Sequence, residues 1–340
     1  MAVRLQDVAE RAGVSMKTVS NVVRDYPHVS PRMRERVQKA IDELGYRPNI
    51  TARRLATGRT GFVALAFADI GIPYFADVAR VASRTAAAFG YRVLLEETDG
   101  TIEGERALLA SSEAGLVDGI LFQPSVMTST EIARHRSDLP IVLLGETPAP
   151  LTMDRVMIDN VAAAREATAH LLAAGRRRIG FVGHERHALT ETSRQRIAGY
   201  QEALEAAGIA PDPRMLLATD SISAADAVTA VGRALDDGLE VDGLVCRDDL
   251  AAIGTLRALQ ERGIDVPGQV SVTGWDDIPL SAVTFPSLTS VSPDLEALVE
   301  RALALLVERI GGYDGAGRHE IVPHRLVVRE SAPDAARASV

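Results

Sequence analysis

The segment LQDVAERAGVSMKTVSNVV, residues 5–23, has the pattern of two short helices joined by a tight turn. In its first half, apolar residues such as Val8 and Ala9 recur at helical spacing, and Gly13 permits the turn that follows. Ser15 is a natural N-cap for the second helix, whose inner side carries valines. The pattern predicts a helix-turn-helix.

The outer side of the second predicted helix combines hydrogen-bonding and cationic groups, which suit base edges and phosphates in a DNA major groove: Met16, Lys17, Ser20, Asn21 and Arg24. An ordinary solvated pair of amphipathic helices is the alternative for this stretch alone. The next stretch weakens that alternative, because Ser30, Pro31 and Gly45 are the N-cap, first residue and terminating glycine of a third helix. Three helices would form a small headpiece.

A short segment, residues 50–58, follows the headpiece and contains Arg53, Arg54 and Leu55. It is too short to be a stable helix by itself in water. Its composition suits a helix that forms only in a minor groove, with arginines near phosphates and Leu55 as a wedge between base pairs. A plain linker is the alternative.

Four runs of the sequence carry a specific resemblance. The runs DVAERAGVSMKTVSNVV, HVSPRMRERV, IDELGYRPN and ARRLATGRTG resemble the DNA-binding end of the LacI/GalR family of transcriptional regulators, and the remainder resembles that family's ligand-binding core. The resemblance implies base-reading positions at Met16, Lys17 and Asn21, a minor-groove wedge at Leu55, and phosphate contacts at Ser15, Thr18, Ser20, His28, Ser30, Tyr46 and Asn49. Asn21 departs from the arginine common there, so the operator's outer bases cannot be inferred from relatives.

Charge is divided unevenly along the chain. Residues 1–60 carry 12 Lys and Arg against 6 Asp and Glu, a net of +6, and the rest carries 25 against 40, a net of −15. A basic headpiece joined to an acidic body is attracted to DNA at one end only. Arg54 is expected to contribute to this attraction.

The composition of the 340-residue chain is that of a soluble α/β protein with room for a headpiece and two further lobes. We expect a cytoplasmic protein, because no leader opens the sequence and no apolar run reaches membrane-spanning length. Cys246 is the only cysteine, which excludes an internal disulfide and a thiolate metal cluster. No cofactor is predicted.

From residue 61 onward, apolar strands alternate with helical stretches, which predicts parallel sheets with helices on both faces. The expected fold is a three-helix helix-turn-helix headpiece and hinge helix, followed by a two-lobed core like that of periplasmic binding proteins. The expected boundaries are a headpiece over 1–49, a hinge over 50–60, a core over 61–330 and a disordered tail over 331–340. We assign 61–158 and 289–318 to lobe 1, and 159–288 and 319–330 to lobe 2, with a helix near 294–310 and one strand near 320–328.

Ligands of such folds bind at the carboxyl ends of strands, here in the cleft between lobes. Polar and aromatic residues at predicted strand ends are therefore the pocket candidates: Asp69, Tyr74, Phe75, Gln123, Glu146, Asp159, Arg196, Arg247, Asp248, Trp275 and Asp276. The family resemblance points to Arg196 and Asp276 as contacts to the effector and to Asp248 as keeping an acidic role. Arg247 replaces a usual asparagine and either pairs with a carboxylate or selects an anion. Trp275 either packs under its loop or faces the ligand.

An enzyme is not expected, because no phosphate-binding glycine loop, His-Glu-x-x-His motif or G-x-S-x-G motif is present. The resemblance instead implies a ligand-responsive repressor, and the recognition of a palindromic operator by two short helices predicts a homodimer. The donor fork of Arg196 and the carboxylates expected at the cleft suit a sugar, neutral in preference to acidic, which would release a repressor of carbohydrate genes from that operator. A corepressor-type regulator responding to a purine or another small metabolite is the alternative, and a sugar-binding or sugar-modifying protein a more remote one. The sequence does not identify the effector, the sign of its effect, the operator, or any assembly larger than a dimer.

Overall fold

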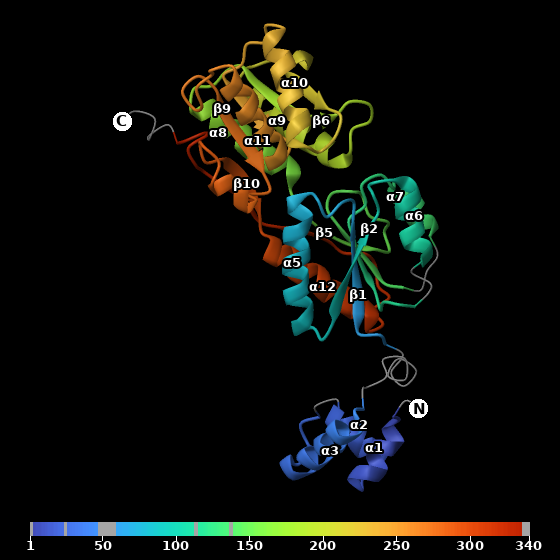
Figure 1. Ribbon diagram of the computed structural model, residues 1–340. Coiled ribbons are helices and arrows are strands. Elements are labelled where there is room, and N and C mark those ends of the chain that lie inside the picture. Colours follow the sequence, from blue (N-terminus) through green and yellow to red (C-terminus); the bar gives the residue numbers. More distant parts are fainter. Residues whose placement is uncertain (1–2, 24–25, 47–58, 112–114, 136–138, 335–340) are drawn as a thin grey trace. The chain divides into compact units, whose positions relative to one another are not determined.

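The computed structural model describes residues 3–23, 26–46, 59–111, 115–135 and 139–334, and the chain divides into two units, residues 1–60 and 61–340 (Figure 1). The first unit contains the three predicted helices, α1 (Leu5–Ala12), α2 (Met16–Val23) and α3 (Pro31–Leu44). Gly13 and Gly45 adopt left-handed conformations with φ of 62° and 63°, as the two helix ends require. The backbone N–H of Thr18 donates to Oγ of Ser15, and that of Met33 donates to Oγ of Ser30. The predicted N-caps are confirmed.

Two six-stranded sheets form the second unit, one in each lobe. The first sheet has the order β11-β5-β4-β3-β1-β2 and is parallel throughout. Its lobe contains β1 (Phe62–Phe67), α5 (Pro73–Ala88), β2 (Arg92–Glu97), α6 (Ile102–Ser111), β3 (Ile120–Phe122), α7 (Ser129–Arg134), β4 (Ile141–Leu144), β5 (Asp154–Ile158), α12 (Leu295–Ile310) and β11 (His319–Val322).

The second sheet has the order β12-β10-β9-β8-β6-β7, in which only β12 runs antiparallel to its neighbour. Its lobe contains α8 (Asn160–Ala173), β6 (Ile179–Glu185), α9 (Glu191–Ala206), β7 (Leu216–Thr219), α10 (Ala224–Asp236), β8 (Gly243–Cys246), α11 (Asp249–Glu261), β9 (Ser271–Trp275), β10 (Thr289–Pro293) and β12 (His324–Val327), with 3-10 turns at Pro213–Met215 and Pro279–Ala282.

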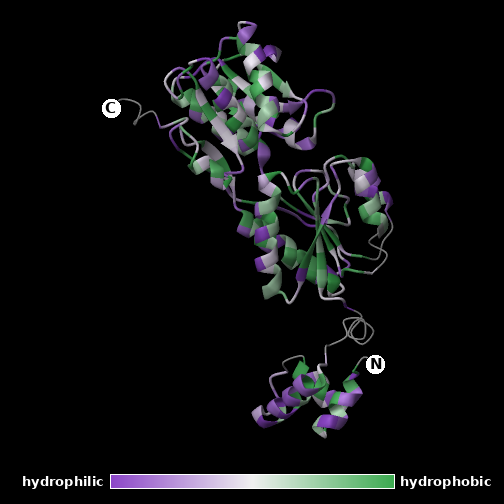
Figure 2. Ribbon diagram, viewed as in Figure 1, coloured by the Kyte–Doolittle hydropathy of each residue, from purple (hydrophilic) through white to green (hydrophobic). Residues whose placement is uncertain are grey.

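Helices cover both faces of each sheet. Apolar side chains of α5 and α12 pack on one face of the first sheet, and those of α6 and α7 pack on the other. Figure 2 shows apolar residues gathered in the strands of this sheet and polar residues on the outer helices. Among the described residues, no helix has both the length and the apolarity needed to cross a membrane.

The expected lobe boundaries are wrong at the carboxyl-terminal end. The single strand expected near 320–328 is two strands, because Pro323 interrupts it: β11 pairs with β5 in the first sheet and β12 with β10 in the second. Residues 289–293 form β10 of the second sheet, although no α-helix separates β10 from β9. The chain therefore crosses between lobes after β5, after β10 and after β11.

The expected disordered tail is also wrong at its start. Ser331 is buried and its hydroxyl donates to the carbonyl oxygen of Val272 at 2.6 Å, while the N–H of Thr289 donates to Oγ of Ser331 at 2.9 Å. Ala332 is buried and its carbonyl oxygen lies 2.8 Å from Nε2 of His170. Residues 335–340 lie outside the described part of the chain.

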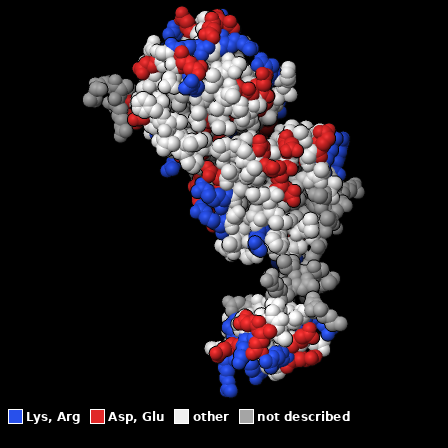
Figure 3. Space-filling view, in the orientation of Figure 1, with Lys and Arg blue, Asp and Glu red and all other residues white. Residues whose placement is uncertain are grey.

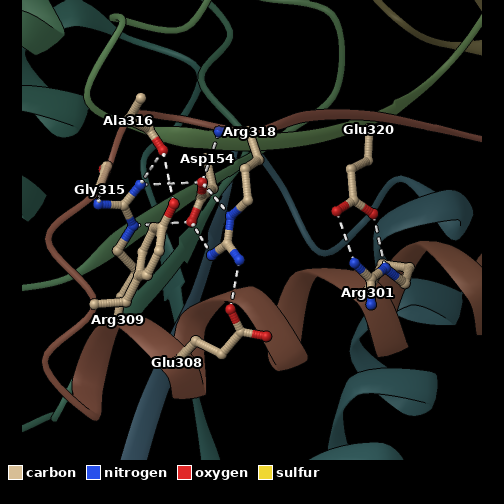
Figure 4. A network of polar contacts seen from close by, with 9 residues as sticks. Asp154, Arg301, Glu308, Arg309, Gly315, Ala316, Arg318 and Glu320 are labelled. Carbon is tan, nitrogen blue, oxygen red and sulfur yellow. Dashed lines mark hydrogen bonds and ion pairs between the residues drawn. The ribbon is translucent and has the colours of Figure 1, made fainter.

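A buried ion-pair cluster joins β5, the end of α12 and the start of β11 (Figure 4). Asp154 is completely buried and receives Nε of Arg309 at 2.9 Å and Nη2 of Arg318 at 3.0 Å. Burial alone would raise the pKa of Asp154, but the hydrogen bonds from Arg309 and Arg318 outweigh burial and hold the pKa at about 2. In the folded state the two arginines therefore offset the cost of burying the charged carboxylate.

Asp154→Asn should lower the free energy of unfolding by roughly 3 kcal/mol, because it leaves two partly buried guanidinium groups without their charge partner. Urea unfolding of the full chain at pH 7 measures the loss. Glu320→Gln is the matched control and should cost under ~1 kcal/mol, because Glu320 forms a more exposed pair with Arg301. Since the folded-state pKa is depressed, the Asp154 contribution is complete above pH ~4 and is lost as the pH falls towards 2, so the difference should shrink in acid. A constant difference down to pH 2 would contradict this account.

Candidate functional site

The predicted recognition face of α2 is available to solvent. Met16 is 54 % exposed, Lys17 is exposed, and Asn21 is half-buried, whereas Val19 and Val22 are buried against α1 and α3. The remaining predicted DNA contacts on this segment are the exposed Ser15 and the half-buried Thr18 and Ser20. The helix therefore presents polar side chains on one side and packs valines on the other, as the sequence predicts.

The other predicted DNA contacts have mixed environments. His28 is exposed, with its ring edge-on to Tyr26 at 5.5 Å, and Ser30 is exposed at the start of α3. Tyr46 packs in the headpiece core, and burial raises the pKa of its phenol. On the face seen in Figure 3, Lys and Arg lie mixed with Asp and Glu over the headpiece. Four of its basic residues, together with Asn49 and Leu55, lie outside the described residues: Arg24, Arg47, Arg53 and Arg54.

A pocket of about 170 Å³ lies between the two lobes of the second unit. It is lined by the carboxyl ends of strands and the beginnings of helices from both lobes. Nine of the eleven predicted pocket residues line it: Tyr74, Phe75, Gln123, Glu146, Arg196, Arg247, Asp248, Trp275 and Asp276. The strand-end rule therefore places these side chains around one cavity.

Arg196 of α9 is held in place by three segments of the pocket wall. Its guanidinium carbon lies 3.8 Å from the centroid of the Trp275 ring, and Nε donates to Oδ1 of Asn160 at 2.8 Å. An Nη group donates to the backbone carbonyl of Arg247. Trp275 is 1 % exposed, so it is both packed under its loop and part of the pocket wall. The arginine has a fixed orientation before any ligand binds.

Arg247 pairs with carboxylates of its own lobe. Nε and Nη2 donate to Oδ2 of Asp248 at 3.0 and 2.8 Å, and Nη1 donates to Oε1 of Glu185 at 2.8 Å. Oδ1 of Asp248 accepts the backbone N–H of Ala251 and caps α11. Burial alone would raise the pKa of Glu185, but the charge of Arg247 and the hydrogen bonds from Ser193 and Thr190 together outweigh burial and lower it. Of the two roles expected for Arg247, the structure favours carboxylate pairing over anion selection.

One polar contact spans the two lobes at the pocket. The hydroxyl of Thr192, in α9 of the second lobe, donates to Oε1 of Glu146, which follows β4 in the first lobe. Nη1 of Arg155 donates to the carbonyl oxygens of Glu146 and Thr147 at 3.1 and 3.2 Å and so positions the Glu146 segment. Tyr74, which also lines the pocket, keeps its proton: burial, with the charges of Asp276 and Glu146, raises the pKa of its phenol. Its phenol thus remains a hydrogen-bond donor.

The negative charge of Asp276 is disfavoured by its position in the pocket wall. Burial raises its pKa well above the usual value, Arg196 opposes that shift, and the charges of Asp249 and Asp248 add to it. Five carboxylates and two guanidinium groups line the cavity: Glu146, Glu185, Glu191, Asp248, Asp276, Arg196 and Arg247. This excess of negative groups favours ligands that offer hydrogen-bond donors and disfavours anions.

Two predicted residues do not line the pocket. Asp69 is exposed and its carboxylate accepts the N–H of Gly71 in a local turn. Asp159 caps α8 by accepting the N–H of Ala162 at 2.9 Å. Phe75 lines the pocket, but its ring also stacks on Phe67 in the core, with 5.2 Å between centroids.

Sequence reasoning missed Asn160, Glu185 and Thr192, which all line the pocket. Asn160 was missed in favour of its neighbour Asp159. Asp159, the first polar residue after β5, caps α8, and Asn160 lines the pocket instead. Glu185 was missed because it is itself the last residue of β6, so a search for polar residues after strand ends passes over it. Asn160 Nδ2 and Trp275 Nε1 are buried donors that lack a hydrogen-bond partner among the described residues, and a bound ligand can supply acceptors for both.

The titratable side chains of the pocket do not form a metal site. In the described part of the chain, no three His, Cys, Asp or Glu side chains are arranged to hold an ion.

Comparisons with known proteins agree with this architecture. The family described as bacterial regulatory proteins, lacI family, matches residues 4–49, and the periplasmic binding protein-like domain matches residues 168–332. The transcriptional regulator RegA of Clostridium saccharobutylicum is 31 % identical over 332 residues, which cover 97 % of this chain and 99 % of RegA. The solved complex of the regulator CelR with cellobiose is 30 % identical, with a TM-score of 0.72, and the match covers 97 % of this chain and 99 % of that one.

The Lac repressor dimer bound to operator and the anti-inducer ONPF is 25 % identical to this chain, with a TM-score of 0.86 and coverage of 98 % and 100 %. The similarity therefore extends over headpiece and core together.

Asp276→Asn should stabilise the ligand-free protein, because the amide removes a buried charge. The gain should be about 1.4 kcal/mol for each tenfold increase in proton affinity that folding gives this carboxylate, whose pKa is raised by burial. Between the unfolded pKa of ~3.9 and the raised folded value, the native state binds more protons, so wild-type stability falls as the pH rises. The gain in thermal midpoint should thus be largest at pH 8 and vanish near pH 4. Asp69→Asn, at an exposed turn, should leave the midpoint unchanged. A destabilised Asp276→Asn protein at pH 8 would contradict the electrostatic account.

Proposed function

The chain belongs to the LacI family of bacterial regulatory proteins, which are DNA-binding transcriptional regulators and not enzymes, and we propose that it represses carbohydrate genes until a neutral sugar binds its pocket. The pocket chemistry carries the proposal. Arg196 and the buried donors of Asn160 and Trp275 can donate to the oxygen atoms of a ligand, and the pocket carboxylates can accept from its hydroxyl groups. A sugar offers both partners at every hydroxyl. The CelR–cellobiose complex supports this choice of ligand class.

A neutral sugar fits better than an acidic sugar. Arg247, the residue that suggested an anionic group, already has Asp248 and Glu185 as partners. The further carboxylate of Glu146 would repel an anion in this pocket. The aromatic ring of Tyr74, which lines the pocket, suits the C–H face of a sugar ring.

The protein acts as a homodimer on a palindromic operator in this proposal. One short recognition helix reads few bases, and two-fold symmetry doubles the contacts. The operator-bound Lac repressor dimer supports this assembly. Because its target is chromosomal DNA, we place the protein in the cytoplasm. Sugar binding shifts the balance between two arrangements of the lobes and so weakens operator binding, by a coupling of typically ~1–3 kcal/mol.

Arg196→Ala should abolish sugar binding in calorimetry while operator binding persists, because loss of a buried partner costs ~1–3 kcal/mol or more. The panel is cellobiose, ribose, glucose, glucuronate and adenine. Arg257→Ala is the control: it removes an exposed arginine of the same lobe, which pairs with Glu261 on α11 and does not line the pocket. Unchanged sugar affinity in Arg196→Ala, or a wild type that binds only adenine or glucuronate, would refute the assignment.

Lys17→Ala and Asn21→Ala should change which operator variants are preferred, because base contacts specify sequence. Arg54→Ala should instead weaken binding to every duplex and reduce the salt slope by ~1. Lys39→Ala removes the same charge as Lys17→Ala from α3, where Lys39 pairs with Glu43, and should retain the wild-type preference. Electrophoretic or fluorescence titrations at two salt concentrations measure these effects. Equal weakening by Lys17→Ala, Asn21→Ala and Arg54→Ala on all duplexes would remove the base-reading assignment.

A further inference from the structure

Asp249 is a buried carboxylate that does not line the pocket. It lies at the start of α11 and is completely inaccessible to solvent. Oδ2 accepts the backbone N–H of Ile278 at 2.9 Å and the hydroxyl of Ser281 at 2.6 Å, and Oδ1 accepts the hydroxyl of Ser290 at 2.6 Å. Its side chain therefore ties α11 to the segment that follows Trp275.

The segment tied by Asp249 has an unusual backbone. Asp276 and Asp277 have φ values of 99° and 53°, a region that residues with a side chain adopt rarely. Such a conformation persists only where the surroundings hold it. Asp277 is held from two sides, since its N–H donates to Oγ of Ser290 and its carboxylate receives Nη2 of Arg329 at 2.6 Å. Asp249 reaches the same segment through Ser290 and through Ile278.

The Asp249 carboxylate packs closely against the backbone of Gly274. A Cβ atom added at Gly274, the residue before Trp275, would lie 2.2 Å from Oδ1 of Asp249. The carboxylate thus fills the space that a side chain at residue 274 would need. Burial raises the pKa of Asp249 to about 6, against the hydrogen bonds from Ser281 and Ser290. A buried carboxylate costs folding free energy that an apolar residue would not, so its structural benefit lies in the segment it holds.

We infer that Asp249 is a positioning residue, which holds Trp275 and Asp276 in the pocket wall without touching the ligand. Trp275 supports the Arg196 guanidinium at 3.8 Å, so the position of the tryptophan also sets that of the arginine. The inference rests on the proposed function only in taking the pocket to bind a ligand. The position of Trp275 can be measured without any sugar, since it is the only tryptophan in the chain.

Asp249→Ala in the full-length protein should shift the Trp275 emission maximum to longer wavelength and increase its quenching by acrylamide. Asp154→Ala is the matched control: it also removes a buried carboxylate, but from the first lobe, and should lower the melting temperature without changing Trp275 emission in the folded state. A purely stabilising role for Asp249 predicts the same outcome as this control. If Asp249→Ala fails to fold, Ser290→Ala tests the same connection, because it removes one partner of Asp249 and the acceptor for Asp277.

Cellobiose and glucose titrations of the same variants separate this inference from the proposed function. If a sugar binds the wild type, Asp249→Ala or Ser290→Ala should raise its dissociation constant roughly 5-fold or more, the effect of one buried hydrogen bond, while operator affinity stays unchanged. An emission change with no sugar binding to the wild type supports the positioning role and contradicts the proposed ligand class. Wild-type emission and quenching in both variants would overturn the positioning role, whatever the sugars do.

Discussion

The guanidinium group of Arg196 contacts three other segments of the second lobe and holds them together as one pocket wall. It comes from α9, rests on Trp275 at the end of β9, and bonds to Asn160 at the start of α8 and to the carbonyl that follows β8. A desolvated cation on an aromatic face contributes about 2 kcal/mol, and a hydrogen bond to a charged group about 1.5–3 kcal/mol. Segments that are far apart in sequence therefore form one pocket wall around this side chain.

Several carboxylates also connect segments that are far apart in sequence. Asp248 and Glu185 share Arg247, and Asp249 takes three donors from the segment after β9. In the first lobe, Glu105 of α6 is completely buried and accepts the N–H groups of the loop after β3, including Met127 at 2.7 Å. That loop carries Gln123 into the pocket. In each lobe a carboxylate outside the cavity thus holds a segment that lines it, which keeps the ligand-facing groups preorganised.

Local signals made the headpiece predictable from sequence. Its caps and turns, such as Ser15 and Gly13, act within a few residues, and the structure has them as expected. Nonlocal choices were not predictable. The sheet that β10 joins and the partner of Arg247, which lies 62 residues away, depend on tertiary packing. The prediction that Asp159 lines the pocket missed by one residue. Asp159 caps a helix, a role that short polar side chains also suit, and its neighbour Asn160 lines the pocket.

The pocket lies at the places where the chain crosses between lobes, so in the proposed function ligand binding can act on the arrangement of the lobes. Asn160 begins the segment after the first crossing and Pro293 precedes the second, and both line the cavity. The Glu146–Thr192 contact adds a direct link between the lobes at the same place. A ligand that contacts these groups binds one arrangement of the lobes better than another, which is the condition for a population shift. The headpiece is continuous in sequence with the first lobe alone, through Gly61 and β1. In the proposed function, a change in the second lobe can therefore reach the first lobe, and from it the headpiece, through these crossings and through the Glu146–Thr192 contact.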